Sequence, residues 1–375
     1  MKINFLHITF FIAIIIFGFS FSNKKFSDPN KEKLLIEIVK YVVEKGHYNS
    51  IEIDDDISEK IFDSYIEQLD AQKRFFLQSD IRQFEKYKYK LDDQLKDYDL
   101  TFFDLVFQTS RERIDEVKDY YYDIMENGFD FSSNESIDLD FENKSFARSK
   151  NEIKNRWRKQ LKYSTLDILT LKLGDSIKII DNETLDESMS LIKKNTEDFF
   201  DYISEMDRDD WFANYINAFL NQLDPHTVYF NPDDKDRFDT NISGKFNGIG
   251  ARLQKTEGAV KIVDIIVGGP IWKDKLLDIG DIILKVAQEN EDPVDIIGMK
   301  LDDAIKLIKG PADSVVRLTI KKIDGEIKDV SIKRGLVELE ELYAKSTLIS
   351  KNNKNYGYIS LPKFYVDFSD KNSRN

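Results

Sequence analysis

The sequence has 375 residues, and 55 Lys and Arg against 69 Asp and Glu give a formal net charge of −14 at pH 7. This length favours two or three domains, and a hydrophobic fraction of 41% is enough for packed cores, so wholesale disorder is excluded. The lack of any Cys excludes disulfides, thiolate metal sites and a cysteine nucleophile. An acidic chain repels phosphate backbones, so nucleic acid is not an expected partner.

The N-terminus has the pattern of a secretory signal. Lys2 is followed by no charged residue until Lys24, and an apolar run covers residues 10–19. Small residues after this run permit cleavage, so we expect residues 1–22 to be a signal peptide and the protein to be exported. The alternative is an uncleaved anchor, because the uncharged stretch 3–23 is about long enough to span a bilayer. The protein would then contact the membrane through that segment.

Residues 28–235 are predicted to form a mostly helical domain. Apolar residues recur at intervals of three and four from Ser79, a natural N-cap residue, to Leu95, which predicts one helix. Further helices are expected after Thr101 and from Asp207, where aromatic and aliphatic residues form one broad stripe. We interpret these aromatic side chains as core.

After Gly244 the spacing of apolar residues changes from helical to alternating, which predicts strands. We expect about five strands and one main helix in residues 236–335, a compact α+β unit. The helix is predicted at residues 301–308, where apolar residues recur at helical spacing. The pair Asp324-Gly325 predicts a hairpin turn between two of the strands.

Two glycines that flank one apolar residue at the start of a strand indicate a binding site in this unit. Successive backbone N–H groups can converge there on an anion, and the strand that follows can pair with an extended peptide. The pattern therefore predicts a groove that captures a free C-terminus, with the carboxylate on the N–H groups and the last side chain in an apolar pocket. The plainer interpretation is an ordinary tight turn. The predicted groove residues are Gly248, Ile249, Gly250, Ala251, Leu253, Leu301, Ile305 and Ile308.

Several stretches resemble a known family. FNGIGARL (246–253), VGGPIWKDKLLDIGDIILKV (267–286) and LDDAIKLIKGPADSVVRLTI (301–320) are similar to a PDZ domain of the permuted bacterial kind. LDAQKRFFLQSDIRQF (69–84) and WFANYINAFLNQLDPHT (211–227) resemble the helical N-terminal domain of tail-specific, or C-terminal-processing, serine proteases. The resemblance runs in the same order over most of the chain.

The resemblance implies an exported, periplasmic endopeptidase that holds apolar C-terminal tails in its PDZ groove and cuts with a Ser/Lys dyad. The expected partners are the tails of exported or misfolded proteins, with an adaptor protein as a second kind of partner. No metal or cofactor is expected. The expected fold class is α+β multidomain, with a helical N-terminal domain, a PDZ-like β-barrel or sandwich with one main helix, and the first strands of an incomplete protease core at residues 336–375.

The family's catalytic segments have no counterpart in this sequence, so we expect no catalytic residue in it and no peptidase activity from this chain alone. Three Ser-x-x-Lys spacings are interpreted as chance: Ser22/Lys25, Ser190/Lys193 and Ser360/Lys363. Two functions stay open. The chain is either the N-terminal portion of a tail-specific serine endopeptidase or a non-catalytic exported PDZ protein, an adaptor or decoy. The start of a further core favours the first.

Overall fold

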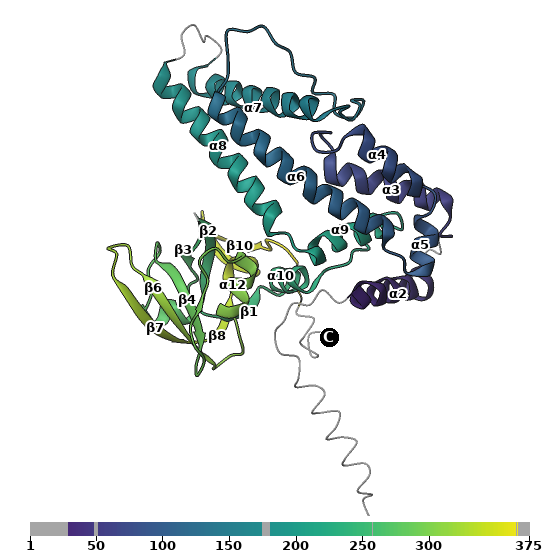
Figure 1. The fold of residues 1–375 in the computed structure, drawn as a ribbon. Helices are drawn as coiled ribbons and strands as arrows, with labels where there is room; N and C mark the ends of the chain where they lie inside the picture. Colours follow the sequence, from purple (N-terminus) through teal and green to yellow (C-terminus); the bar gives the residue numbers. More distant parts are fainter. Residues whose placement is uncertain (1–28, 49–51, 175–180, 257, 365, 367–375) are drawn as a thin grey trace, which may run out of the picture. The chain divides into compact units, whose positions relative to one another are not determined.

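The structure, a computed structural model, describes residues 29–48, 52–174, 181–256, 258–364 and 366 (Figure 1). The predicted signal peptide and the Ser22/Lys25 pair lie outside the described residues. Two compact units divide the chain after Tyr229, and each has its own set of elements. The expected fold class is confirmed, because helices come first and an antiparallel sheet with one main helix and further strands follows.

The first unit consists of helices that pack around aromatic side chains. Its helices are α2 (Pro29–Gly46), α3 (Asp55–Asp70), α4 (Gln78–Phe84), the short 3-10 helix η1 (Glu85–Tyr87), α5 (Leu91–Asp97), α6 (Thr101–Asn127), α7 (Lys150–Leu173), α8 (Asn182–Glu205) and α9 (Arg208–Leu220). The helices expected after Thr101 and from Asp207 are confirmed. The Asp207 side chain accepts the N–H of Asp210, which caps α9.

The aromatic stripe of α9 lies in the core, as predicted. Trp211, Phe212 and Tyr215 are each at most 4% exposed. Tyr215 packs edge-on against Tyr65 of α3 and stacks on Phe103 of α6, with ring centroids 5.2 and 5.5 Å apart. Burial of large aromatic side chains therefore joins helices that are distant in sequence.

The prediction that Ser79 caps a helix is wrong. Helix α4 begins at Gln78, and its N-cap residue is Leu77. The carboxylate of Asp80 accepts the Leu77 N–H at 2.9 Å, so an acidic residue in the first turn satisfies the open helix end. Ser79 lies inside the helix instead of before it.

The single helix predicted to run on to Leu95 is also wrong, because the helix is interrupted before α5. The Ser58 hydroxyl, on α3, donates to the Lys88 carbonyl at 2.8 Å and accepts the Leu91 N–H at 2.7 Å. A side chain from another helix thus replaces two backbone hydrogen bonds at the break. The apolar spacing continues across the interruption, which is why the sequence alone did not reveal it.

The second unit is an antiparallel sheet with one main helix. Its six-stranded sheet has the order β2-β3-β4-β6-β7, with β5 beside β4, and β1 pairs with β8. The elements are α10 (Pro232–Ser243), β1 (Lys245–Gly248), β2 (Ala251–Thr256), β3 (Ala259–Ile265), α11 (Pro270–Asp274), β4 (Ile282–Gln288), β5 (Val294–Asp295), α12 (Leu301–Ile308), β6 (Val315–Lys321), β7 (Ile327–Lys333), β8 (Gly335–Glu338), η2 (Glu340–Leu342), β9 (Lys345–Lys351) and β10 (Lys354–Ser360).

The core of this unit follows the alternation read from the sequence. Along β6, Val316, Leu318 and Ile320 are fully buried, and the residues between them are more exposed. The predicted helix and the predicted hairpin are both confirmed, as α12 and as the turn between β6 and β7. Side chains on one face repeat about every 3.6 residues in a helix and about every 2 residues in a strand. The spacing of the apolar residues therefore indicates which element can bury them on one face.

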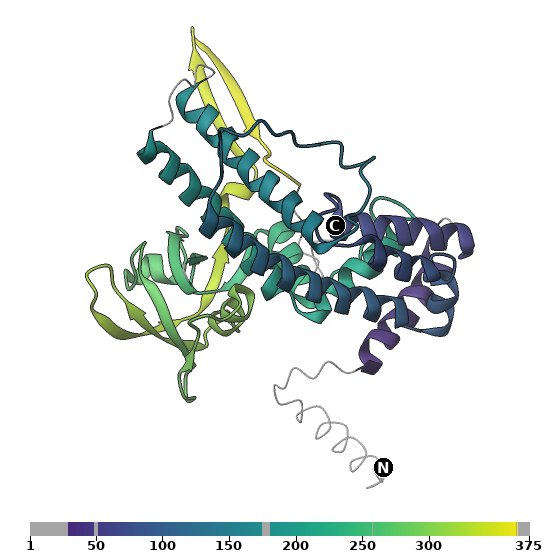
Figure 2. The ribbon, with the colours of Figure 1, turned by 45° about the horizontal axis from the view of Figure 1, so that its top comes forward.

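Strands β9 and β10 form a separate hairpin, drawn in yellow in Figure 2. Most of its large apolar side chains are exposed, for example Ile359 at 76% and Leu348 at 67%. Within the described residues, this hairpin therefore exposes apolar surface on both of its strands. Among the helices of the described chain, none combines the length and apolarity needed to cross a membrane.

Candidate functional site

Most of the predicted groove residues lie around one cavity of the second unit, with a volume of about 380 Å³. Leu301 is the exception, because it packs half-buried against the core of the unit. The lining residues are Gly248, Ile249, Gly250, Ala251, Leu253, Ile305 and Ile308, together with Thr240, Phe246, Arg252, Ile266, Lys309 and Leu339. The structure therefore brings together residues that are more than 50 positions apart.

Two elements form the walls of the cavity. Strand β2 pairs with β3 on one side and has no strand on its other side in the described sheet, so it is an edge strand. Helix α12 supplies the opposite wall through Ile305 and Ile308. An edge strand beside an apolar helix face can take one more strand, with the side chains of that strand alternating into the space between.

The glycine loop at the end of the cavity has its carbonyl groups turned into the fold. The Gly250 carbonyl accepts the Ile266 N–H at 2.9 Å, and the Ile249 carbonyl accepts the Ile271 N–H at 3.0 Å. Within the described residues, the N–H groups of Ile249 and Gly250 have no hydrogen-bond partner. Two adjacent free N–H groups at the end of a cavity can hold an anion such as a carboxylate.

Only glycine fits at position 250. Its φ is +86°, and a Cβ there would lie 3.0 Å from the Cα of Gly269. Any side chain would therefore strain the backbone and push two chain segments apart. This explains the second glycine of the sequence pattern.

The sequence analysis missed Lys309, which follows the last residue of α12 and lines the cavity. Its ammonium lies 5.1 Å above the centre of the Phe246 ring, and no carboxylate lies within 4.0 Å of it in the described part of the chain. Burial lowers the pKa of Lys309, and the charges of Asp236 and Asp302 partly oppose this. The Lys309 charge therefore stands beside the glycine loop, where an anion would reduce the cost of its burial.

Two of the Ser-x-x-Lys pairs lie within the described residues, and their interpretation as chance stays a prediction. Ser190 is exposed on α8, and the Lys193 side chain is 58% exposed. Lys363 donates to the carbonyl of Asn241. No cluster of three His, Asp or Glu that could hold a metal ion occurs among the described residues.

The helical unit gives the deciding comparison. Residues 38–233, just over half of the chain, match the family described as "Tail specific protease N-terminal domain". The chain belongs to the tail-specific protease family. In this member of the tail-specific protease family, residues 240–321 also match the PDZ domain family, and this range contains strands β1 to β6, α12 and most residues that line the cavity.

Curated relatives agree with this assignment. The tail-specific protease of Haemophilus influenzae is 31% identical over 328 residues, which cover 87% of this chain and 46% of the relative. The carboxy-terminal processing protease CtpA of Bacillus subtilis is 30% identical over 165 residues, which cover 44% of this chain and 33% of the relative. The chain thus spans less than half the length of these curated relatives.

Two solved structures are also similar. The PDZ domain of a carboxy-terminal protease from Vibrio cholerae, crystallised in complex with a peptide, is 41% identical, covers 25% of this chain and 99% of its own, and has a TM-score of 0.25. The photosystem II D1 C-terminal processing protease is 21% identical, with 46% of each chain covered and a TM-score of 0.26.

Proposed function

We propose that this chain binds apolar C-terminal tails of substrate proteins in the groove between β2 and α12, as the substrate-recognition part of a serine endopeptidase. The observation that carries the proposal is the pair of free N–H groups on Ile249 and Gly250 at the end of an apolar cavity. The tail carboxylate bonds to these N–H groups, and the tail backbone pairs with β2. The last side chain enters the cavity beside Ile305.

Lys309 strengthens this recognition by charge. A free carboxylate beside its ammonium is favoured by the low dielectric of the half-buried site, whereas an amidated terminus is not. Ala251, a small residue at the start of β2, leaves room for a branched or aromatic last residue. We expect micromolar dissociation constants, roughly −8 kcal/mol, because a short peptide buries little area.

The proteolytic step is part of the proposal and is assigned to no residue of this chain. The family resemblance supports cleavage by a Ser/Lys dyad outside these 375 residues. We also propose that the protein is exported to the periplasm, on the strength of Lys2 and the apolar run after it. A non-catalytic PDZ protein is the second candidate, favoured by the purely binding character of the described site. Cleavage of a tailed substrate by the 375-residue chain would contradict the expectation that this chain alone is inactive.

The direct test is calorimetric titration of the full chain with an eight-residue peptide that ends in Leu, with a free or an amidated C-terminus. The free form is expected to bind at micromolar concentration and the amidated form at least tenfold more weakly. Gly250→Val is expected to abolish binding, because the side chain fills the loop. Gly325→Val is the matched control, since Gly325 also has a positive φ (+92°) but lies in the hairpin turn with no neighbour within 4 Å. Equal binding of both peptide forms would overturn the proposal.

A second variant keeps the test valid if Gly250→Val fails to fold. Lys309→Glu is expected to weaken binding of the free-carboxylate peptide about tenfold and to leave the amidated peptide unchanged. Lys328→Glu, an identical charge reversal at an exposed position near the start of β7, is the control. Unchanged affinity in Lys309→Glu would remove this residue from the site.

A further inference from the structure

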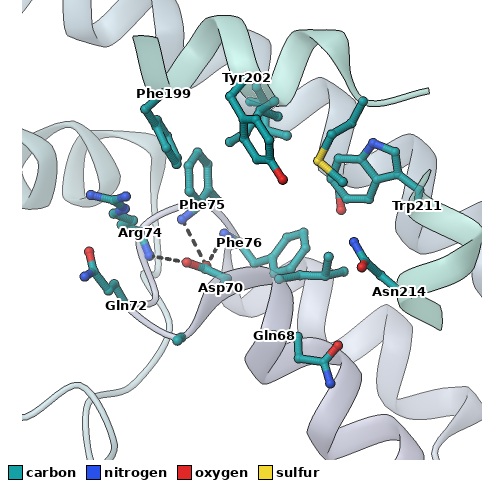
Figure 3. A pocket seen from close by; sticks show the side chains of 16 residues that line it. Gln68, Asp70, Gln72, Arg74, Phe75, Phe76, Phe199, Tyr202, Trp211 and Asn214 are labelled. Carbon is teal, nitrogen blue, oxygen red and sulfur yellow. Dashed lines mark hydrogen bonds between the residues drawn. The ribbon is translucent and has the colours of Figure 1, made fainter. Parts of the chain in front are cut away.

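The helical unit contains a cavity of its own, with a volume of about 370 Å³ (Figure 3). The end of α3 and the loop that follows it form one wall, and α6, α8 and α9 form the others. All of its lining residues belong to the first unit. Nothing in the groove or in the proposed tail binding uses this space.

The loop wall of the cavity is held by Asp70. This carboxylate is 4% exposed and accepts the backbone N–H groups of Arg74, Phe75 and Phe76 at 2.8, 3.0 and 2.9 Å, the dashed lines in Figure 3. The Arg74 guanidinium stacks on the Trp157 ring at 4.3 Å. The Asp70 carboxylate is therefore held by backbone N–H groups, and the Arg74 guanidinium is held against aromatic rings.

Three buried polar atoms of the lining residues lack hydrogen-bond partners within the described residues: the acceptor Gln72 Oε1, the Ser110 Oγ and the Trp211 Nε1. Ser110 on α6 and Trp211 on α9 are 3% and 4% exposed. Within the described residues, neither the Ser110 Oγ nor the Trp211 Nε1 makes a hydrogen bond. An indole N–H can only donate, so the missing partner must contain an acceptor. Figure 3 shows the Asn214 amide directed into the same space, which adds another donor.

The remaining surface of the cavity is apolar. Phe75, Phe76 and Phe199 line it, and Met206 offers an adaptable side chain. Exposed Tyr202 lies at its rim, 66% accessible, so the cavity opens to solvent. A volume near the lower end of ligand sites suits one large apolar side chain and its neighbouring groups.

We propose that this cavity binds one apolar side chain of a polypeptide substrate together with the backbone carbonyl next to it. The side chain lies among the Phe75, Phe76 and Phe199 rings, and the carbonyl accepts from Ser110 and Trp211. A peptide carbonyl supplies the acceptor that the indole N–H of Trp211 needs. Binding at this site does not require a free chain terminus. That the bound polypeptide is a substrate rests on the proposed function.

The test uses N-acetyl-phenylalanine amide, a neutral probe with an aromatic side chain, backbone carbonyls and no free carboxylate. Titration of the full chain, followed by NMR, is expected to give millimolar binding. Ser110→Ala is expected to weaken binding of the probe about fivefold, because one hydrogen bond is lost. The variant is expected to fold, because the hydroxyl has no hydrogen-bond partner within the described residues. Ser188→Ala, on α8 and bonded to the Thr184 carbonyl, is the matched buried control. Trp211→Phe is expected to act in the same direction as Ser110→Ala.

Further outcomes separate this site from the groove. The probe is expected to bind Gly250→Val as it binds the wild type, and N-acetyl-phenylalanine with a free acid is expected to bind more weakly. Equal binding by the wild type and Ser110→Ala, or equal binding of ethylbenzene and the probe, would overturn the proposal. If the tail peptide fails to bind while the probe shows this pattern, the tail-binding proposal fails and the cavity assignment stands.

Discussion

Two arginines, Arg208 in the helical unit and Arg334 in the second unit, bind different kinds of acceptor. In the helical unit, Arg208 of α9 donates twice to Glu32 of α2, at 2.6 and 2.7 Å, and once to Asp104 of α6. In the second unit, which holds the PDZ match and is called the PDZ unit, Arg334 is 3% exposed. Its bonds within the described residues go to neutral acceptors, among them the carbonyls of Leu307 and Ile308 at the end of α12. Burial alone lowers the pKa of Arg334.

The difference follows from what each arginine must hold. Arg208 joins three helices, because α2 and α6 each present a carboxylate to it, and a charge-assisted hydrogen bond to a carboxylate is strong. Helix α12 ends inside its unit with open carbonyls, and a cation at a helix C-terminus both satisfies them and complements the helix dipole. Arg334 therefore holds the helix that forms one wall of the groove.

The largest expected loss of stability follows from replacing Arg208. Arg208→Ala leaves the Glu32 carboxylate, 4% exposed, without its cation, so we expect the helical unit to lose about 3–4 kcal/mol of unfolding free energy. Urea denaturation followed by circular dichroism measures it. Lys31→Ala is the control on the same two helices, because the Lys31–Asp209 pair is 44% exposed on both sides and contributes less than about 1 kcal/mol. Similar losses in both variants would contradict this account.

The unfolding free energy of the helical unit is expected to depend on pH through Asp70. Burial raises the pKa of Asp70 to about 6, although three N–H donors favour its charged form. The folded protein thus holds this proton more tightly than the unfolded chain, and the stabilisation is complete below about pH 4 and is lost as pH rises through about 6. We expect up to about 3 kcal/mol of decrease in this range. Denaturation of Asp70→Asn, measured at the same pH values, should lack it, and a pH slope equal to that of the wild type would contradict the assignment.

Arg334→Met tests whether this arginine stabilises the end of α12. Two helix carbonyls and the Gln288 side chain lose their donor, so we expect a loss of about 2 kcal/mol in the PDZ unit and weaker tail binding. Arg317→Met is the control, because that guanidinium donates to the Glu291 carbonyl at an exposed site. Differential scanning calorimetry and peptide titration together measure both effects. Wild-type stability with reduced tail binding would mean that Arg334 acts on the ligand and not on α12.

The smallest expected effect concerns the helix break. Ser58→Ala removes the bonds to Lys88 and Leu91, so we expect a loss of about 1 kcal/mol in the helical unit. Ser204→Ala removes a comparable but exposed hydroxyl bond on α8 and is expected to change stability by less than about 0.5 kcal/mol. Faster hydrogen exchange at Leu91 in Ser58→Ala would locate the loss at the break, and unchanged exchange there would count against this role.

Local patterns were sufficient for much of the fold. The alternation along residues 315–321 and the helical spacing at 301–308 each fit one kind of element, and the structure confirms both. The glycine pair around Ile249 predicted a loop with convergent N–H groups, and those groups do lack partners within the described residues. These features depend on neighbours in the chain, so the sequence carries them directly.

Features that depend on distant residues were not readable in this way. Leu301 and Ile305 share an apolar pattern, but only the packing of α12 on the sheet sends the first to the core and the second to the cavity. Lys309 is one lysine among many until Phe246 and the glycine loop surround it.

The sequence by itself determined the order of a helical unit and a PDZ unit, because hydrophobic period and turn chemistry are local properties. The tertiary structure decided where α4 and α5 separate and which buried polar atoms lack a partner within the described residues. Ser110 and Trp211 lie about a hundred positions apart in the chain. Their hydrogen bonds are left open only because α6 and α9 pack side by side, and such packing is a property of the whole core.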